Sequence, residues 1–216
     1  MSEKPDRKKL WRTAFILAVI TIVYNLIEGV VSVVFGYSDA TLSLFGFGLD
    51  SFVEVVSGIG VLHMVARTLK NNGERDRFEK TALRITALGF YLLAAGLVVT
   101  AVVNIISGST PATTVWGIVV SSISIVTMVV LMNAKLKVGR KLDSPAVIAD
   151  AHCTRTCLYL SVVLLGASVI FELFHIAFVD AIGALLIAWY SFSEGREAFE
   201  KARGGACGCS GAFERD

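Results

Sequence analysis

Long apolar stretches recur along this chain of 216 residues and indicate a bilayer rather than water as its solvent. Several reach the roughly 20 residues that an α-helix needs to cross a hydrocarbon core. The composition agrees, because 55% of the residues are hydrophobic, 18% are charged, and the mean hydropathy is +0.69. We therefore predict an all-α, polytopic membrane protein, a bundle of six transmembrane helices. The approximate limits of the six spans are Trp11–Phe35, Thr41–Val65, Ala82–Ser107, Thr114–Ala134, Ala146–Leu173 and Ile176–Phe192.

Basic residues are distributed unevenly between the connections. Of the 20 Lys and Arg residues, 19 are counted with the N-terminus, the connection between spans two and three, the connection between spans four and five, or the C-terminal segment, and Arg155 falls well within a span. Arg12 and Arg84, in the first turns of spans one and three, are counted with the adjoining connections. Lys135 and its basic neighbours are assigned to the connection between spans four and five. Since Lys and Arg accumulate in cytoplasmic loops, both termini are expected in the cytoplasm, at the plasma (inner) membrane if the chain is bacterial. The net charge of +2 is then a topology signal, and no nucleic-acid partner is expected.

Three regions follow from this pattern. We expect a basic cytoplasmic N-terminus over residues 1–10, a six-span domain over 11–197, and a flexible cytoplasmic tail over 198–216. The segment after the sixth span is too short to bury a core of its own, so one compact helical domain is expected. A cleavable signal peptide is not expected, because the first apolar run is long and no small-residue cleavage site follows it.

Two pairs of metal-ligating residues interrupt the apolar spans. Asp50 and Glu54 lie in the second span, and Cys153 and Cys157 lie in the fifth. A spacing of four places both members of a pair on one face of a helix. Acids within spans are costly and usually mark an ion or proton pathway. A rise of 1.5 Å per residue brings both pairs near the midplane, with Asp50 level with Cys157, so the four side chains suit tetrahedral coordination of one metal ion.

Other polar residues extend this interior. A stripe on span one consists of Tyr24, Asn25, Glu28 and Ser32. With Asp150 on span five, its first three members are candidates for an accessory metal or proton pathway. Glu28 is either a second proton carrier or a hydrogen-bonded structural acid, and Asp150 is either a first-turn helix acid or a gate ligand. Solvated caps are expected at the outer ends of the last two spans, at Glu172, His175 and Asp180.

Blander interpretations of the central pairs stay open. The two acids could form only a helix–helix hydrogen-bonding pair, although two acids at the membrane centre without a cation are costly. The two cysteines could pack as small hydrophobic residues, as free cysteine often does.

Three segments together resemble the cation diffusion facilitator family: 43–54 (SLFGFGLDSFVE), 149–157 (ADAHCTRTC) and 180–185 (DAIGAL). The resemblance covers the six-span unit. It implies exchange of a divalent metal, most often zinc, for protons at an acidic pair on span two and a His or Asp pair on span five. Here Asp50 and Glu54 match the acidic pair, while Cys153 and Cys157 occupy the other positions. Typical members continue into a cytoplasmic domain, whereas this sequence stops soon after Arg203, so a homodimer would either form through membrane helices or be absent.

Ligand chemistry and burial together predict metal–proton exchange. Two thiolates and two carboxylates disfavour magnesium and calcium and favour zinc, or a softer ion such as cadmium. Apolar surroundings favour neutral carboxyls and thiols, whereas a divalent cation requires their ionised forms, so metal binding would release protons. We expect a secondary transporter rather than an enzyme, with the metal as cargo and no prosthetic group. Efflux would proceed by alternating access around the midplane site.

Two further interpretations belong to other classes. A membrane thiol-disulfide oxidoreductase would pass electrons between the tail cysteines, Cys207 and Cys209, and the pair in span five. Cysteines four apart on a helix reach disulfide geometry only with strain, and this interpretation leaves the acids unexplained. A non-transporting metal sensor could use the same bundle. In the transporter, the tail cysteines either capture a soft metal or are inert.

Overall fold

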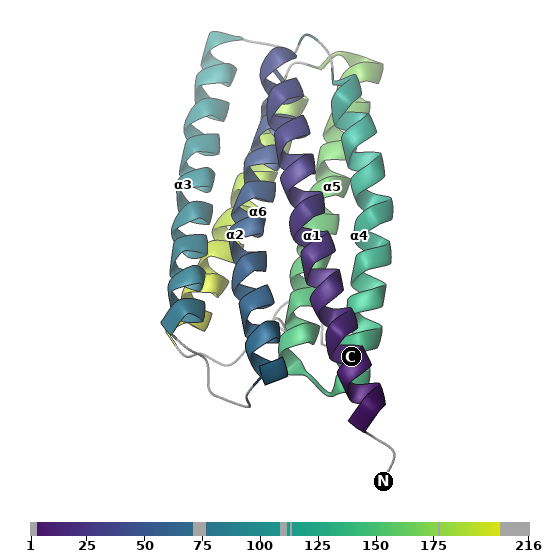
Figure 1. The fold of residues 1–216 in the computed structure, drawn as a ribbon. Coiled ribbons are helices and arrows are strands. Elements are labelled where there is room, and N and C mark those ends of the chain that lie inside the picture. The colour runs from purple at the N-terminus through teal and green to yellow at the C-terminus, as the bar shows by residue number, and fades with distance from the viewer. Residues whose placement is uncertain (1–3, 71–76, 109–111, 113, 177, 204–216) are drawn as a thin grey trace, which may run out of the picture.

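The structure is a computed structural model of the chain, and it describes all residues except 1–3, 71–76, 109–111, 113, 177 and 204–216. A few helical residues, Cys153 among them, are described by their backbone only. Within the described residues the chain forms helices and no strands, which confirms the all-α prediction. The helices are α1 (Lys4–Ser38), α2 (Leu42–Lys70), α3 (Arg77–Ser107), α4 (Val115–Leu142), α5 (Pro145–Phe174) and α6 (Phe178–Ala202) (Figure 1).

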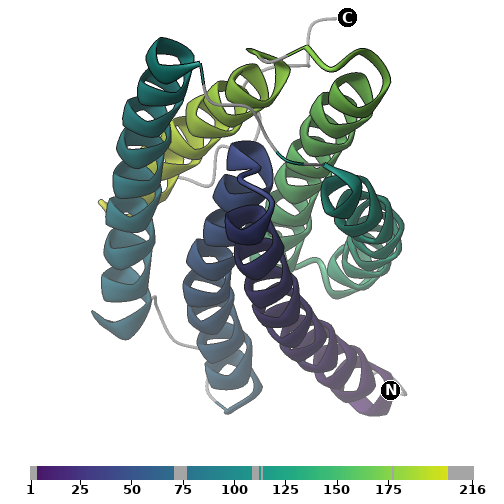
Figure 2. The same cartoon turned by 90° about the horizontal axis from the view of Figure 1, so that it is seen from above.

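Consecutive helices run in opposite directions, and they associate as three main pairs. The most extensive contacts join α1 with α2, α3 with α6, and α4 with α5. Seen from above, the α1–α2 pair lies between the other two pairs (Figure 2). Within the described chain, α2 contacts every other helix. The helix that carries Asp50 and Glu54 is therefore the centre of the bundle.

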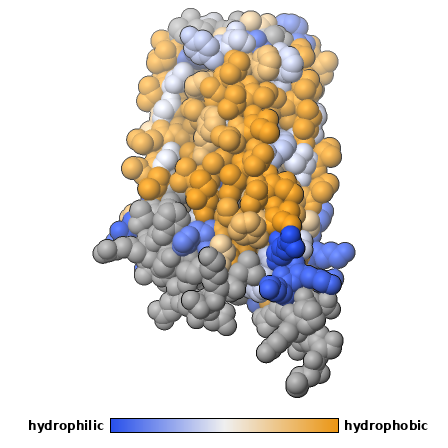
Figure 3. Space-filling view, viewed as in Figure 1, coloured by the Kyte–Doolittle hydropathy of each residue, from blue (hydrophilic) through white to orange (hydrophobic). Residues whose placement is uncertain are grey.

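The outer surface is apolar over most of its height. Figure 3 shows a broad hydrophobic band between hydrophilic side chains at the two ends, with the most hydrophilic ones at the lower end. Among the described helices, α1 to α5 contain segments long and apolar enough to cross a membrane, while α6 falls short of that standard. Exposed apolar side chains line this surface, for example Ile27, Leu92, Val126 and Trp189. Contact with lipid rather than water accounts for such a surface.

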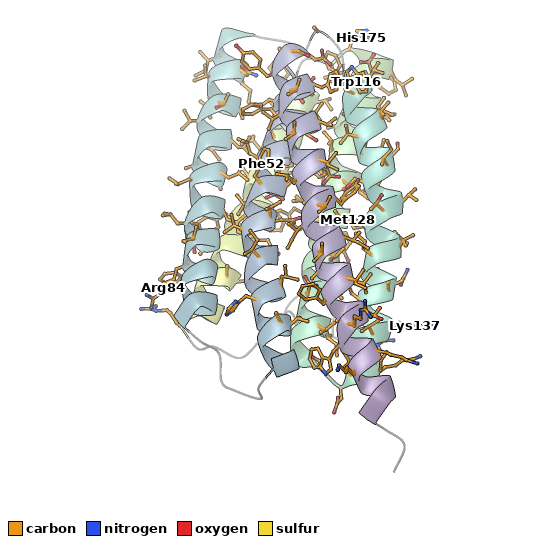
Figure 4. All side chains as sticks on the ribbon, viewed as in Figure 1. Phe52, Arg84, Trp116, Met128, Lys137 and His175 are labelled. Carbon is orange, nitrogen blue, oxygen red and sulfur yellow. The ribbon has the colours of Figure 1, made fainter. Side chains whose placement is uncertain are left out.

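Basic side chains mark one end of the bundle. Arg84 and Lys137 lie at the end where α3 begins and α4 approaches its C-terminus, opposite Trp116 and His175 (Figure 4). This arrangement agrees with the segregation of basic residues along the sequence. The cytoplasmic assignment of that end stays a prediction.

The prediction that Lys135 belongs to a cytoplasmic connection is wrong. Helix α4 continues to Leu142, where Asp143 closes it in the left-handed conformation, so Lys135 lies within the helix with 1% of its surface exposed. The sequence pattern ends span four at Ala134 because a lysine that follows an apolar stretch usually marks the end of a span. At the other end of the chain, α6 continues to Ala202, so residues 198–202 of the expected flexible tail are helical.

Glycines allow α1 and α2 to approach closely. A Cβ on Gly36 of α1 would lie 2.5 Å from the backbone nitrogen of Phe45, and one on Gly48 of α2 would lie 2.8 Å from the Cβ of Ser32. Small residues at helix interfaces are a main source of association in membranes, where the hydrophobic effect does not drive helices together. The close pairing of α1 with α2 therefore depends on having glycine, which carries no side chain, at these two positions.

We predict that Gly36→Ala lowers the free energy of unfolding by about 1–3 kcal/mol, because the added methyl group overpacks the α1–α2 contact. The matched control is Gly96→Ala on α3, where no atom lies within 4 Å of the added Cβ. Thermal unfolding in detergent, followed by circular dichroism, measures both variants. Equal melting temperatures would contradict the close-packing explanation.

Candidate metal centre

Glu54 connects three helices in the bundle interior. Asn25 Nδ2 of α1 donates a hydrogen bond of 2.9 Å to Glu54 Oε2, and Cys157 Sγ of α5 donates one to Glu54 Oε1. Asn25 and Cys157 are buried, and Glu54 is partly buried. The structure thus unites one acid of span two with one cysteine of span five, as the sequence predicts for two of the four ligands.

Asp50 lies one turn nearer the start of α2 and bonds to a different helix. Its Oδ1 accepts a hydrogen bond of 2.9 Å from Ser191 Oγ of α6, and only 3% of Asp50 is exposed. The register therefore differs from the expected one, since Cys157 meets Glu54 rather than Asp50. The number of residues from the end of a helix does not determine how that helix tilts and packs, and tilt and packing set the relative heights of residues on two helices.

Four-ligand coordination stays a prediction. The side chain of Cys153 lies outside the described residues. Among the side chains that are described, no three His, Cys, Asp or Glu residues converge in metal-binding geometry. Asp50, Glu54 and Cys157 are therefore neighbours within one polar interior, arranged around hydrogen bonds.

Glu28 forms a second acidic position between α1 and α2. Tyr24 Oη donates to Glu28 Oε1 at 3.0 Å, and Ser51 Oγ donates to Glu28 Oε2 at 3.1 Å. Both oxygens of this buried carboxyl group are thus engaged, and one of their two partners, Ser51, directly follows Asp50 in the chain. These bonds favour the structural role of Glu28, while its role as a proton carrier stays a prediction.

Serines on α4 and α6 also belong to the polar interior, and the sequence pattern did not predict this. Ser191 binds Asp50, and Ser124 of α4 lies 2.8 Å, oxygen to oxygen, from Ser161 of α5, whose hydroxyl donates to the Cys157 carbonyl. A serine within an apolar span is a weak signal, because its hydroxyl can bond to its own helix. Ser121 does so with the Gly117 carbonyl at 2.6 Å.

Asp150 pairs with the buried lysine of α4. Lys135 Nζ lies 2.9 Å from Asp150 Oδ2 and donates to Thr154 Oγ1 at 3.0 Å. The interpretation of Asp150 as a first-turn helix acid is wrong, because the first turn of α5 contains no acid. Its carboxylate instead neutralises Lys135, which explains how α4 can bury a cation. The proposal of Asp150 as an accessory or gate ligand gains no support from this contact.

Acids from neighbouring helices cap the N-termini of α2 and α4. Asp180 of α6 accepts hydrogen bonds from the backbone nitrogens of Leu42 at 2.7 Å and Ser43 at 3.1 Å, and from the Ser43 hydroxyl. Glu172 of α5 accepts from the backbone nitrogen and hydroxyl of Thr114. The first N–H groups of a helix have no partner within it, and carboxylates satisfy them well. The expectation of a solvated cap at Asp180 is wrong, since that residue is 3% exposed.

The fold and its interior define a polytopic membrane protein whose central helix carries buried acids. The family model described as the cation efflux transmembrane domain matches residues 14–203. This chain therefore belongs to the cation efflux family, which confirms the resemblance found in its sequence.

An uncharacterized transporter of Methanocaldococcus jannaschii is also similar to this chain. The two are 29% identical over 175 residues, which cover 79% of this chain and 62% of the relative. The chain thus spans less than two thirds of the length of that relative.

We predict that Lys135→Met lowers the free energy of unfolding by about 3–5 kcal/mol, because it leaves the Asp150 carboxylate without its buried partner. The double variant Lys135→Met with Asp150→Leu should recover much of the loss, since both charges are then absent. Lys137→Met, at an exposed position of the same helix, is the matched control. Unfolding in detergent measures all three, and an equal loss for Lys135→Met and Lys137→Met would refute the role of the ion pair.

Proposed function

We propose that this protein transports a divalent transition-metal cation across a membrane in exchange for protons, with zinc as the expected cargo. The contact between Glu54 and Cys157 carries this proposal, because it brings a carboxylate and a thiol from two helices together inside the bundle. Asp50 supplies a second carboxylate from the next turn of α2, and Cys153 is the proposed fourth ligand. Membership of the cation efflux family supports cation transport as the class of activity.

The ligand types favour zinc or cadmium over other ions. Magnesium and calcium prefer shells made entirely of oxygen, whereas zinc accepts sulfur and oxygen ligands in tetrahedral geometry. Cadmium is softer and would gain relatively more from the thiolates. Cuprous ion would gain little from the two carboxylates. Zinc is therefore the expected cargo and cadmium the first competitor.

The hydrogen bond between Cys157 and Glu54 suggests how protons are coupled to the metal. A thiol that donates a hydrogen bond still carries its proton, whereas a metal ion binds the thiolate. Binding of a divalent cation between these groups would break the Sγ–Oε1 hydrogen bond and release the thiol proton. Return of a proton to the site would in turn weaken metal binding. Proton and metal thus compete for the same atoms.

Transport also requires access from each side in turn. We propose that the α4–α5 pair and the α3–α6 pair rock against the central α1–α2 pair while the acids of α2 stay near the midplane (Figure 2). Efflux from the cytoplasm, a homodimer formed through membrane helices, and metal capture by Cys207 and Cys209 are further parts of the proposal. The two tail cysteines lie outside the described residues.

We predict that Asp50→Asn abolishes proton-driven zinc uptake into vesicles. The amide can still accept the hydrogen bond from Ser191, so the variant removes the charge and preserves the packing. Reconstituted vesicles that contain a metal-sensitive dye and carry an imposed pH gradient would report the uptake of zinc, cadmium, manganese and cobalt.

The matched control is Glu200→Gln, which removes an acid from an exposed position of α6 and should leave uptake unchanged. Zinc uptake by the wild type that ignores the pH gradient, or that survives Asp50→Asn, would contradict the exchange mechanism. Zinc binding without uptake would favour the metal-sensor interpretation.

A further inference from the structure

Asn25 of α1 is the residue whose polar groups the interior network leaves incompletely satisfied. Its side chain is 2% exposed, and its Nδ2 donates to Glu54 Oε2 at 2.9 Å. Its Oδ1 is buried and has no hydrogen-bond partner among the described residues. An asparagine thus lies directly beside the acid that also receives the hydrogen bond of Cys157.

Chemistry fixes which way this amide faces. An ionised Glu54 only accepts hydrogen bonds, so in the ionised state, the one that binds a cation, the nitrogen of Asn25 faces Glu54. The carbonyl oxygen lies in the same amide plane, on the other branch from Cγ. With Glu54 ionised, exchanging the oxygen with the nitrogen would set two acceptors against each other.

A buried acceptor without a partner is costly. Leaving such a group unsatisfied costs about 1–3 kcal/mol, and native proteins rarely retain one without a reason. The surroundings of Asn25 are rich in acceptors, since Glu54 bonds to its amide and Glu28 lies one turn further along α1. A cation is the partner that such a cluster of oxygen atoms would bind best.

We propose that Asn25 is a direct ligand of the transported cation through Oδ1, while its Nδ2 positions the Glu54 carboxylate. This inference rests on the proposed function of the same site. It adds a ligand from α1 to a centre otherwise built from α2 and α5. An amide oxygen is a neutral and hard ligand, so it adds no negative charge and shifts the preference of a thiolate-containing site toward zinc and away from cadmium.

Substitution by leucine provides the first test. We predict that Asn25→Leu, which removes both polar groups at nearly constant volume, weakens zinc binding by about 10- to 100-fold. Cadmium binding should weaken less, because the thiolates that dominate it remain. Isothermal titration of the full chain in detergent measures both affinities.

Ser32→Ala is the matched control. Ser32 is on the same helix, is fully buried, and has a hydroxyl oxygen that likewise lacks a partner among the described residues. Its Cβ lies against Gly48 of α2, and among the described residues its hydroxyl has no hydrogen bond to an acid. Zinc and cadmium affinities should be those of the wild type.

Substitution by aspartate provides a second test that does not depend on the first variant folding. Asn25→Asp keeps an oxygen at the proposed ligand position and adds a charge that a bound cation would neutralise. The rise in melting temperature caused by zinc should therefore exceed that of the wild type, since a ligand that binds only the folded state stabilises it.

The outcomes separate this inference from the proposed function. Unchanged zinc and cadmium affinities in Asn25→Leu, with an unchanged zinc-induced melting shift in Asn25→Asp, would overturn the inference and leave the transporter proposal intact. Equal weakening of both metals in Asn25→Leu would reduce Asn25 to a positioning residue and also overturn it. A third outcome is that zinc binding weakens in Asn25→Leu as expected while the wild type carries no zinc into vesicles. That result would support the ligand role and refute transport.

Discussion

Burial of carboxyl groups within an apolar helix bundle is the constraint on which this structure depends. Water cannot reach the interior of a bilayer to solvate them, so each must find its partners within the protein. The two acids of α2 do so through different helices, since Glu54 bonds to Asn25 and Cys157 while Asp50 bonds to Ser191. The polar interior is therefore shared by α1, α2, α5 and α6, with α2 at its centre.

The same requirement explains features far from the midplane. Lys135 can be buried because Asp150 and Thr154 bind its ammonium group. The first N–H groups of α2 can be buried because Asp180 accepts their hydrogen bonds. Close approach through glycines then brings α1 against α2. Hydrogen bonds to Asp180 fix the start of α2, and close packing against α1 fixes the part that follows. The acids of α2 are therefore kept at defined positions in the bundle.

Hydrogen bonds between a thiol, an amide and carboxyl groups hold together the interior at which we propose metal–proton exchange. In that proposal each of these groups gives up a hydrogen bond in return for a metal ion, and the thiol must lose its proton to do so. The structure describes these groups in their mutually bonded arrangement. In the proposed cycle, metal and proton alternate at the same atoms, and no separate proton site is required for coupling.

The sequence alone was sufficient for the all-α class, the helix order, the family and the acids of α2, because apolar length and residues of high cost in lipid are local properties of the chain. The spacing of four and the depth along each helix also predicted that Cys157 lies near that acidic pair. Register, partners and burial were decided only by tertiary packing. Cys157 meets Glu54 rather than Asp50, Lys135 turns inward to Asp150, Asp180 is buried against α2, and Ser191 completes the interior. Such pairings depend on the tilt and contact of helices distant in sequence, and no local pattern of residues encodes them.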